Sequence, residues 1–534
     1  MSLRFVLYAV GKLCIVLAAI MLVPAAIAVA ECLPLTPRAA FFNPRLVGFW
    51  VGIVGAFMCG AVLVLAGRKS AGGNSAREGF AIVTFSWIIL TFFSSFPLFV
   101  YFLANEPWVD PARVLRCFTN AYFEIMSGYT TTGATILTDI EALPKGILFW
   151  RSMTHWLGGM GIVTLALAIF PAFGVAGYQM FRGELPGPTK ERLRPRLAQT
   201  AKILWGVYAL LTAAETALLY IGGMSLFDSL CHAFGTMATG GFSTRNASIG
   251  AYTSAYVDWV VIIFMFFAGI NFMIHYRVLF NGKFNVLSTD PEFRFYILVV
   301  SAAVCVTVTV LSIGGLAGKE SVARSFRPTA ISDTQLDARM NAEAAKVAPT
   351  GGMIRHAVFQ VVSITTTTGF CTADFDMWPD VLRLMLVALM FFGGCAGSTG
   401  GGMKMIRIMV VLKAAWRHVK TTVQPRLVAP IKISGTLIEE KLVHTITGFF
   451  LLFILLFAFF SLVMSCIVPD FTTAITSVAA TMCNIGPGLS GIGPTETYAW
   501  IPLSGKWVLI ICMLLGRLEV FTVLIAFAPI SWRK

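Results

Sequence analysis

Four short stretches of the sequence join threonine or asparagine to glycine, a combination that can present oxygen atoms to a cation. A dehydrated cation needs a ring of oxygens in place of its lost water, and backbone carbonyls can supply that ring where glycine lets the chain turn them inward. Threonine hydroxyls add further oxygen ligands. We therefore interpret twelve residues as a candidate binding site for a monovalent cation such as potassium: Thr131, Thr132 and Gly133; Ala238, Thr239 and Gly240; Thr367, Thr368 and Gly369; and Asn484, Ile485 and Gly486.

Each of these turns follows a short amphipathic segment that is too short to cross a membrane. A helix that ends at such a turn directs its partly negative C-terminal end toward the turn, which favours a cation there. A single turn of this kind is ordinary loop chemistry. Four turns at equivalent places, with their key glycines about 105 to 130 residues apart, indicate an internal repeat instead.

The composition predicts a protein that is solvated by lipid over most of its length. The 534 residues are 57% hydrophobic and 12% charged, whereas soluble domains are about 45–50% apolar and about 25% charged. A helix needs about 20 apolar residues to cross a bilayer. Candidate spans occupy residues 5–30, 46–66, 80–103, 147–170, 203–221, 256–280, 295–313, 381–394, 445–468 and 507–528.

Each polar turn lies between two of these spans, so the repeating unit is a span, a short helix with a polar turn, and a second span. Irregular backbone at membrane depth is tolerated only inside protein or beside water, so the four turns are expected to meet around one cavity. The predicted fold is an all-α membrane protein with four such repeats around a pseudo-fourfold axis and two leading transmembrane helices. The expected boundaries are 1–76 for the leading helices and 77–180, 181–284, 285–420 and 421–534 for the repeats.

The formal net charge of +14 reflects topology rather than a nucleic-acid partner. Basic residues gather in short segments between apolar stretches, which marks the cytoplasmic side. This places both termini in the cytoplasm and the mixed-charge stretch 319–355 outside. The first apolar run resembles a signal peptide but is longer than usual, and a second span follows it, so a retained helix is favoured.

No motif of a membrane enzyme is found in the sequence. The eleven cysteines include no C-x-x-C pair, and the six histidines include no H-E-x-x-H. A catalytic site inside the bundle would need a nucleophile–base pair, metal ligands or a carboxylate cluster. We expect neither an enzyme nor a metal centre other than the cation site.

A glycine-rich interruption divides the span that begins at residue 381. It is either a kink at tight helix packing or a flexible loop that lies under the turns and acts as a gate, with Gly397, Ser398, Thr399, Gly400, Gly401 and Gly402 as the expected gate residues. Arg517 is a charge inside an apolar span, which is costly unless it faces water or a partner. It either pairs with a carboxylate such as Glu519 or lines the pore beneath the turns and holds the gate. Glu124 and Asp228, on the short helices, either support the turns or face outer water.

Several stretches together resemble the TrkH/KtrB family of potassium-uptake proteins, and the two leading helices place the chain nearer the TrkH branch. These stretches are residues 131–135, 155–161, 397–404, 484–488 and 516–519. The resemblance implies potassium-selective uptake across the bacterial inner membrane, with K+ as the transported ion. It also implies a homodimer with one pore per protomer, gated by a cytoplasmic ring of TrkA-like nucleotide-binding subunits. The second and fourth turns depart from strict Thr-x-Gly symmetry, which limits how sharply potassium is preferred over sodium.

Three other transport mechanisms fit parts of the pattern. A sodium- or proton-coupled potassium symporter of the same fold is the main alternative to a channel-like pore. A secondary transporter with broken helices usually has two inverted repeats, whereas these four units run in the same direction. The potassium-binding subunit of a pumping ATPase has related turns, but the leading helices and residues 516–519 favour TrkH.

Overall fold

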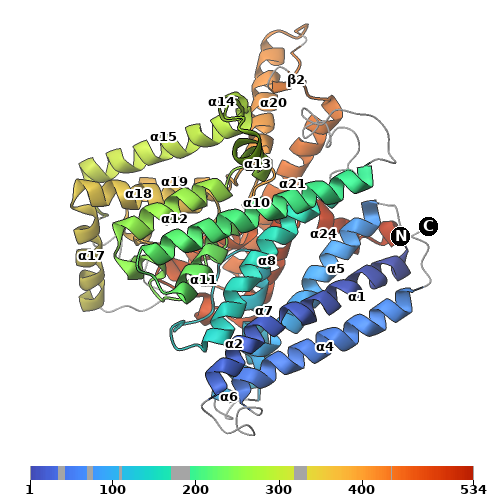
Figure 1. The fold of residues 1–534 in the computed structure, drawn as a ribbon. Helices are drawn as coiled ribbons and strands as arrows, with labels where there is room; N and C mark the ends of the chain where they lie inside the picture. Colours follow the sequence, from blue (N-terminus) through green and yellow to red (C-terminus); the bar gives the residue numbers. More distant parts are fainter. Residues whose placement is uncertain are drawn as a thin grey trace.

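The computed structural model describes residues 2–33, 43–68, 76–106, 111–169, 193–317, 333–427, 429–433 and 436–532. Nearly all of the regular structure in these residues is helical (Figure 1), as predicted. The strands in the described part are a short antiparallel pair, β1 (Lys432–Ile433) and β2 (Thr436–Leu437). The chain is therefore a helical bundle, and its long apolar helices agree with a membrane protein.

The leading helices pack against each other and against the first repeat. Helices α1 (Leu3–Ile20) and α2 (Leu22–Cys32) form one apolar stretch of 30 residues, and α4 (Pro44–Gly67) returns beside it. Gly11 and Gly60 bring the two backbones close, since a Cβ on either glycine would lie 2.8 Å from the carbonyl oxygen of the other. Such small-residue contacts are typical of helix pairs in membranes.

The first apolar stretch contacts the first repeat. At the end of α2, the Glu31 carboxylate accepts hydrogen bonds from the backbone N–H groups of Lys145 and Gly146, at 2.8 and 3.0 Å. These two residues begin α8 (Lys145–Ile169), so the leading helices cap a helix of the first repeat.

The four predicted repeats follow one another along the chain. Each contains a first span, a short helix that leads to a polar turn, and a second span. The first repeat consists of α5 (Ala76–Ser94), α6 (Phe96–Asn105), α7 (Arg113–Tyr129) and α8; the second of α10 (Leu193–Ile221), α11 (Leu226–Met237), α12 (Ala255–Ala268) and α13 (Phe272–Asn281); the third of α15 (Pro291–Gly314), α18 (Thr350–Thr365), α19 (Asp380–Met390) and α20 (Met405–Val423); and the fourth of α21 (Glu440–Ser465), α22 (Phe471–Met482), α23 (Leu503–Arg517) and α24 (Val520–Phe527).

Two predicted spans are not continuous helices. Residues 256–280 and 507–528 were each expected to cross in one piece, but α12 and α13 meet at 104° and α23 and α24 at 110°. In the third repeat α19 and α20 are separated by a long non-helical segment. The hydropathy of these stretches is continuous, so composition alone could not place the breaks. Among the described residues, six helical stretches are long and apolar enough to cross a membrane: Leu3–Cys32, Pro44–Gly67, Arg77–Asn105, Thr200–Ile221, Pro291–Gly314 and Glu440–Ser465.

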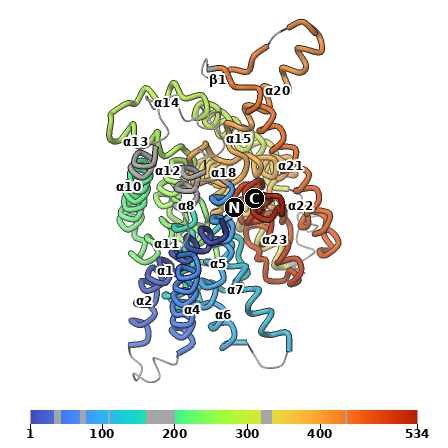
Figure 2. The backbone as a smooth tube through the Cα atoms, turned by 90° about the vertical axis from the view of Figure 1, so that its right-hand side faces the viewer, coloured from blue at the N-terminus to red at the C-terminus, as the bar shows by residue number. Residues whose placement is uncertain are grey.

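Smaller elements connect the repeats. Helix α14 (Asn285–Thr289) joins the second repeat to the third, and α17 (Asp333–Val347) precedes the third short helix. The chain ends in α25 (Pro529–Trp532). The two termini lie side by side in both views (Figure 1, Figure 2), and both contact α5: the Ser2 N–H donates to Glu78, and the ring of Trp532 lies 6.2 Å from that of Phe85.

Candidate cation pathway

The four polar turns share one backbone conformation. Each has a residue in the left-handed region followed two positions later by a glycine with positive φ. Three of the four left-handed residues are threonines, for which this region is strained because the side chain is β-branched. Strain of this kind persists where the surrounding structure enforces it, often at functional sites. The pairs are Thr131 (φ 50°) with Gly133 (78°), Thr239 (54°) with Gly241 (78°), Thr367 (59°) with Gly369 (82°), and Asn484 (56°) with Gly486 (100°).

This geometry corrects the predicted alignment of the second turn by one residue. Gly241, not Gly240, is the equivalent of the glycines at 133, 369 and 486. Gly240 takes the place that Thr132 has in the first turn, because each donates its N–H to a carbonyl oxygen five residues earlier in its short helix. Ala238 therefore precedes the turn, and the sequence comparison was misled by the adjacent pair of glycines. The equivalent bonds are Thr132 N to Ser127 O (2.9 Å), Gly240 N to Gly235 O, Thr368 N to Ser363 O and Ile485 N to Ala480 O (each 2.8 Å).

The turns meet in a closed ring. Each positive-φ glycine lies against the carbonyl oxygen of a neighbouring turn, so close that an added Cβ would be under 3.0 Å from that oxygen. Following these contacts leads from the first turn to the second, third and fourth and back to the first. Only glycine fits there, and four carbonyl groups are brought together around one axis. The contacts are Gly133 with Gly240 O, Gly241 with Thr368 O, Gly369 with Ile485 O, and Gly486 with Thr132 O.

Hydroxyl groups supplement the carbonyl ring in two of the turns. The hydroxyls of Thr130 and Thr132 lie 2.8 Å apart, and those of Thr366 and Thr368 are separated by the same distance. All four side chains are buried. A ring of oxygens without a nearby opposite charge suits a weakly hydrated monovalent cation that exchanges its water for carbonyl groups.

The extended segment that follows a turn is held by the short helix that precedes the turn. In the first repeat the Glu124 carboxylate accepts from the Ile136 N–H and the Thr135 hydroxyl, both at 2.9 Å. In the third, Gln360 donates to the Ala373 carbonyl oxygen at 3.3 Å. This agrees with the interpretation of Glu124 as a support of the turn rather than a residue that faces water.

The second repeat uses polar side chains in the same way. His232 lies 2.9 Å from the Ser243 hydroxyl, and Asp228 accepts from the Thr244 hydroxyl at 2.6 Å. Asp228 also accepts from Ser225, which caps α11. Both acidic residues singled out in the sequence thus stabilise backbone beyond a turn. His232 is fully buried and hydrogen-bonded, as expected.

A stack of side chains behind the second turn was missed in the sequence. The Arg151 guanidinium lies 3.5 Å from the centre of the Phe242 ring, and the His155 ring stacks on Phe242 at 3.9 Å. Arg151 also forms a buried ion pair with Glu124, with 2.6 Å between Nε and Oε1. A Cβ on Gly240 would collide with the His155 ring. A charged residue inside the predicted span 147–170 was the available signal.

The segment between α19 and α20, residues 391–404, is a loop that we call the glycine-rich loop. It is not a helix kink, so that alternative is wrong. The loop is closed at its base, where Gly393 N donates to Met403 O at 2.8 Å and Met403 N to Phe391 O at 3.3 Å. Its tip, residues 397–402, reaches the turns, which agrees with its predicted position beneath them.

The tip contacts three turns. The Thr399 hydroxyl donates to the Met237 carbonyl oxygen before the second turn, at 2.9 Å. The Gly401 N–H donates to the Thr367 hydroxyl of the third turn at 2.6 Å. A Cβ on Gly401 would lie 2.8 Å from that of Asn484 in the fourth. The loop therefore crosses the axis that the carbonyl ring defines.

Arg517 holds the tip of the glycine-rich loop through the backbone. Its Nη1 donates to the Thr399 carbonyl oxygen at 2.8 Å and its Nη2 to that of Gly158 at 3.3 Å. The alternative of an ion pair with Glu519 is wrong, because Glu519 instead accepts two hydrogen bonds from Arg407, both at 2.8 Å. Arg517 is 2% exposed, so its charge is directed at the loop from inside the bundle.

Lys404, at the end of the glycine-rich loop, turns back toward its tip. Its ammonium group donates to the carbonyl oxygen of Gly400. Lys404 therefore adds a second positively charged side chain at the tip of the loop. It binds the carbonyl group of Gly400, and Arg517 binds that of the neighbouring residue Thr399.

Helix α17 contacts the extended segments that follow the third and fourth turns. Glu343 accepts from the Asp374 N–H at 3.1 Å, and Arg339 pairs with Glu496 at 2.9 Å. Burial, together with the nearby Glu343 charge, raises the pKa of Asp374 above its usual range.

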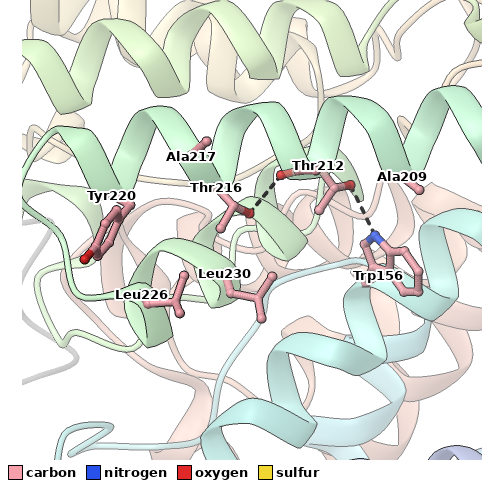
Figure 3. A pocket seen from close by; sticks show the side chains of 9 residues that line it. Trp156, Ala209, Thr212, Thr216, Ala217, Tyr220, Leu226 and Leu230 are labelled. Atoms are coloured by element: carbon pink, nitrogen blue, oxygen red, sulfur yellow. Dashed lines mark hydrogen bonds between the residues drawn. The ribbon is translucent and has the colours of Figure 1, made fainter.

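A separate groove on the bundle does not suit an ion. It has a volume of about 500 Å³ and lies along α10 beside α8 and α11 (Figure 3). The lining side chains are small or apolar, and Trp156 donates to the Thr212 hydroxyl at 3.2 Å. No charged side chain is among the described residues that line it. Grooves of this kind fit hydrocarbon chains.

The fold and the ring together define a class of protein: a single-chain, four-repeat pore-loop protein of the membrane. Comparison with known proteins places it more narrowly. The chain matches the family model TrkH, described as a cation transport protein, over residues 48–534. It therefore belongs to the TrkH family, as the resemblance in the sequence predicted.

Individual relatives cover nearly all of the chain. It is 39% identical to the Trk system potassium uptake protein TrkH of Escherichia coli over 480 residues, which are 90% of this chain and 91% of the relative. It is 35% identical to the Trk system potassium uptake protein TrkH of Vibrio parahaemolyticus over 537 residues, covering all of both chains. The crystal structure of the potassium transporter TrkH from Vibrio parahaemolyticus superposes with a TM-score of 0.81 at 33% identity, again over both full chains.

Proposed function

We propose that the protein carries potassium across the bacterial inner membrane through a channel-like pore with the four turns as its selectivity filter. The observation that carries this proposal is the closed ring of glycines and carbonyl oxygens that links all four turns. The names of the relatives, which are potassium uptake proteins, support potassium as the transported ion. Transport rather than catalysis also agrees with the description of the family.

The proposed ligands are the carbonyl and hydroxyl oxygens of the turns. They belong to Thr131, Thr132 and Gly133; Thr239, Gly240 and Gly241; Thr367, Thr368 and Gly369; and Asn484, Ile485 and Gly486. Ala238 is replaced by Gly241 in this set because of the corrected alignment. Stacked carbonyl oxygens replace the hydration shell of potassium, and the C-terminal ends of the four short helices add a negative potential.

The glycine-rich loop is the proposed gate, with residues Gly397, Ser398, Thr399, Gly400, Gly401 and Gly402 at its tip. Its position across the axis supports this role, and Arg517 holds it there. Arg517→Ala is expected to raise cation flux several-fold, because the tip loses a hydrogen bond from a charged donor. Unchanged flux through a folded variant would contradict the gate.

The names of the relatives support a proposal for the assembly. The relatives are named as components of a Trk system, which supports regulation by further subunits. We infer a homodimer with one pore per protomer and a cytoplasmic, TrkA-like nucleotide-binding partner. We also infer that both termini are cytoplasmic, which the shared position of the two ends beside α5 supports.

The experiment that tests the function is rubidium or potassium uptake by the purified protein in liposomes, with sodium as competitor. Uptake that follows the potassium gradient alone indicates a channel-like pore. Uptake driven by a sodium or proton gradient would indicate the symporter alternative. No cation uptake by folded protein, with or without its regulator, would overturn the proposal.

A further inference from the structure

The glycine-rich loop is held at two places by different parts of the molecule. Its tip is bound to the second and third turns and to Arg517 of the fourth repeat. On both sides of the tip, the chain is bound to one residue of the third repeat, Glu292, in the first turn of α15. A gate needs a part that moves and a part that stays in place. The first set of contacts holds the tip, which moves, and the contacts of Glu292 hold the part that stays in place.

Glu292 binds residues on both sides of the tip with one atom: Ala396 in the loop and Ile406 in the first turn of α20. Its Oε1 accepts from the Ala396 N–H at 2.7 Å and from the Ile406 N–H at 3.0 Å. The residue is 8% exposed. Hydrogen bonds to a buried carboxylate are stronger than those between neutral groups, and a lost partner leaves the N–H groups unsatisfied.

The side chain is not needed as a cap for its own helix. Acidic residues in a first turn often serve the helix N-terminus, but in α15 Asp290 does so by accepting from the Phe293 N–H at 2.8 Å. Glu292 is therefore directed to the loop. In the fourth repeat, the acidic residue in the first turn of α21, Glu440, pairs with Arg417 instead.

The loop also rests on the break in the second repeat. Cys395 N donates to the Gly269 carbonyl oxygen at 2.8 Å, and Phe272 N to that of Gly397 at 3.1 Å. Gly269 lies between α12 and α13, where the span bends. The base of the loop is thus wedged between α15 and this bend.

We propose that Glu292 is a positioning residue for the gate, which staples the residues on both sides of the tip to α15 so that only the tip moves. The inference rests on the proposed function, since it assumes that the loop is a gate. Without the staple the loop below the tip is held only by its backbone hydrogen bonds, so the tip loses its alignment with Thr367 and Arg517 and the closed arrangement becomes less populated.

The variants that test this proposal differ in the length of the side chain at position 292 as well as in its charge. In Glu292→Ala the acceptor is absent, and in Glu292→Asp the carboxylate is one methylene too short to reach both N–H groups. We expect both to raise regulator-free rubidium flux in liposomes by about tenfold, the effect of losing one hydrogen bond to a charged group. Glu292→Gln keeps a carbonyl acceptor and should remain near wild type. Glu440→Ala is the matched control and should also be unchanged.

A second measurement follows the loop directly. Cys395 lies in the loop beside Ala396 and is 1% exposed. Alkylation by N-ethylmaleimide, quantified by mass spectrometry of the peptide that contains Cys395, should be faster in Glu292→Ala and Glu292→Asp and unchanged in Glu292→Gln and Glu440→Ala. A role in folding alone would not be rescued selectively by Gln over Asp.

Arg517→Ala, measured in parallel, separates the two proposals. If it raises flux while Glu292→Ala and Glu292→Asp alter neither flux nor Cys395 alkylation, the staple is wrong and the gate stands. If Glu292→Gln behaves like Glu292→Ala, the assignment to the shared acceptor oxygen is overturned. If Arg517→Ala also leaves flux unchanged in folded protein, the gate itself is refuted, and the staple with it.

Discussion

The first and third turns differ from the second and fourth in the groups they add to a common backbone. The first and third carry three consecutive threonines before the glycine, with paired hydroxyls 2.8 Å apart. The second and fourth have Ala238 and Cys483 in place of the first threonine of the pair, and Gly240 and Ile485 in place of the second. The backbone hydrogen bonds are nevertheless the same in all four.

The comparison separates what the cation site requires from what it tolerates. Backbone shape is retained wherever four carbonyl groups must meet, whereas paired side-chain hydroxyls occur on the first and third turns, which are opposite each other. The ring is therefore fourfold in its carbonyls and twofold in its paired hydroxyls. Because carbonyl oxygens are common to all four turns, we attribute cation binding chiefly to the backbone and the finer preference between cations to the threonines.

The largest effect is expected from a side chain placed in the ring. Gly369→Ala puts a Cβ onto the Ile485 carbonyl oxygen at a positive φ, so it should abolish potassium uptake in liposomes. Gly448→Ala, on an open face of α21, is the control and should transport normally. Normal uptake by Gly369→Ala would mean that the ring is not the pathway.

A large loss of stability is expected where a turn relies on a buried charge pair. Glu124→Ala leaves Arg151 buried without its carboxylate partner, which should destabilise the protein by about 3–5 kcal/mol. Thermal unfolding in detergent measures this. Gln360→Ala, the corresponding change behind the third turn, removes a neutral hydrogen bond and should cost about 1 kcal/mol. Equal losses would contradict the different anchoring of the two turns.

A smaller effect is expected from the hydroxyls that distinguish the turns. Thr368→Val removes one hydroxyl of the third turn and keeps the shape of the side chain, so potassium affinity in uptake assays should fall by about tenfold, the value of about one hydrogen bond. Thr368→Ser should restore it. An Ile485→Val change in the fourth turn, which has no hydroxyl to lose, should leave affinity near wild type. Indistinguishable Val variants would show that hydroxyls play no part.

The smallest effect is expected from the hydrogen bond that links the fourth turn to the first. Asn484 donates to the Thr132 hydroxyl at 2.9 Å and to the Met513 carbonyl oxygen at 3.1 Å. Asn484→Ser should weaken this tie and lower the preference for potassium over sodium about two- to threefold, with uptake retained. Competition of sodium with rubidium uptake measures the preference, and a preference equal to wild type would count against the tie.

Much of the pathway could be predicted because it is encoded locally. Runs of apolar residues specify helices long enough for lipid, and the threonine–glycine turns between them mark the four repeats. For Glu124 and Asp228 the sequence left two roles open, and the structure places both carboxylates against the segments that follow the turns. The alignment of the second turn could not be obtained this way, since Gly240 and Gly241 are adjacent and only the φ angle distinguishes them.

The sequence by itself determined the helical membrane fold, the number of repeats and all but one of the residues that form the turns, because burial in lipid and turn formation depend on neighbouring residues. Only the tertiary structure decided which groups meet across the bundle: Arg517 with Thr399, Glu519 with Arg407, and Glu292 with the residues on both sides of the tip of the glycine-rich loop. Those pairings join residues more than a hundred positions apart, and they depend on where packing bends the spans, which hydropathy does not record.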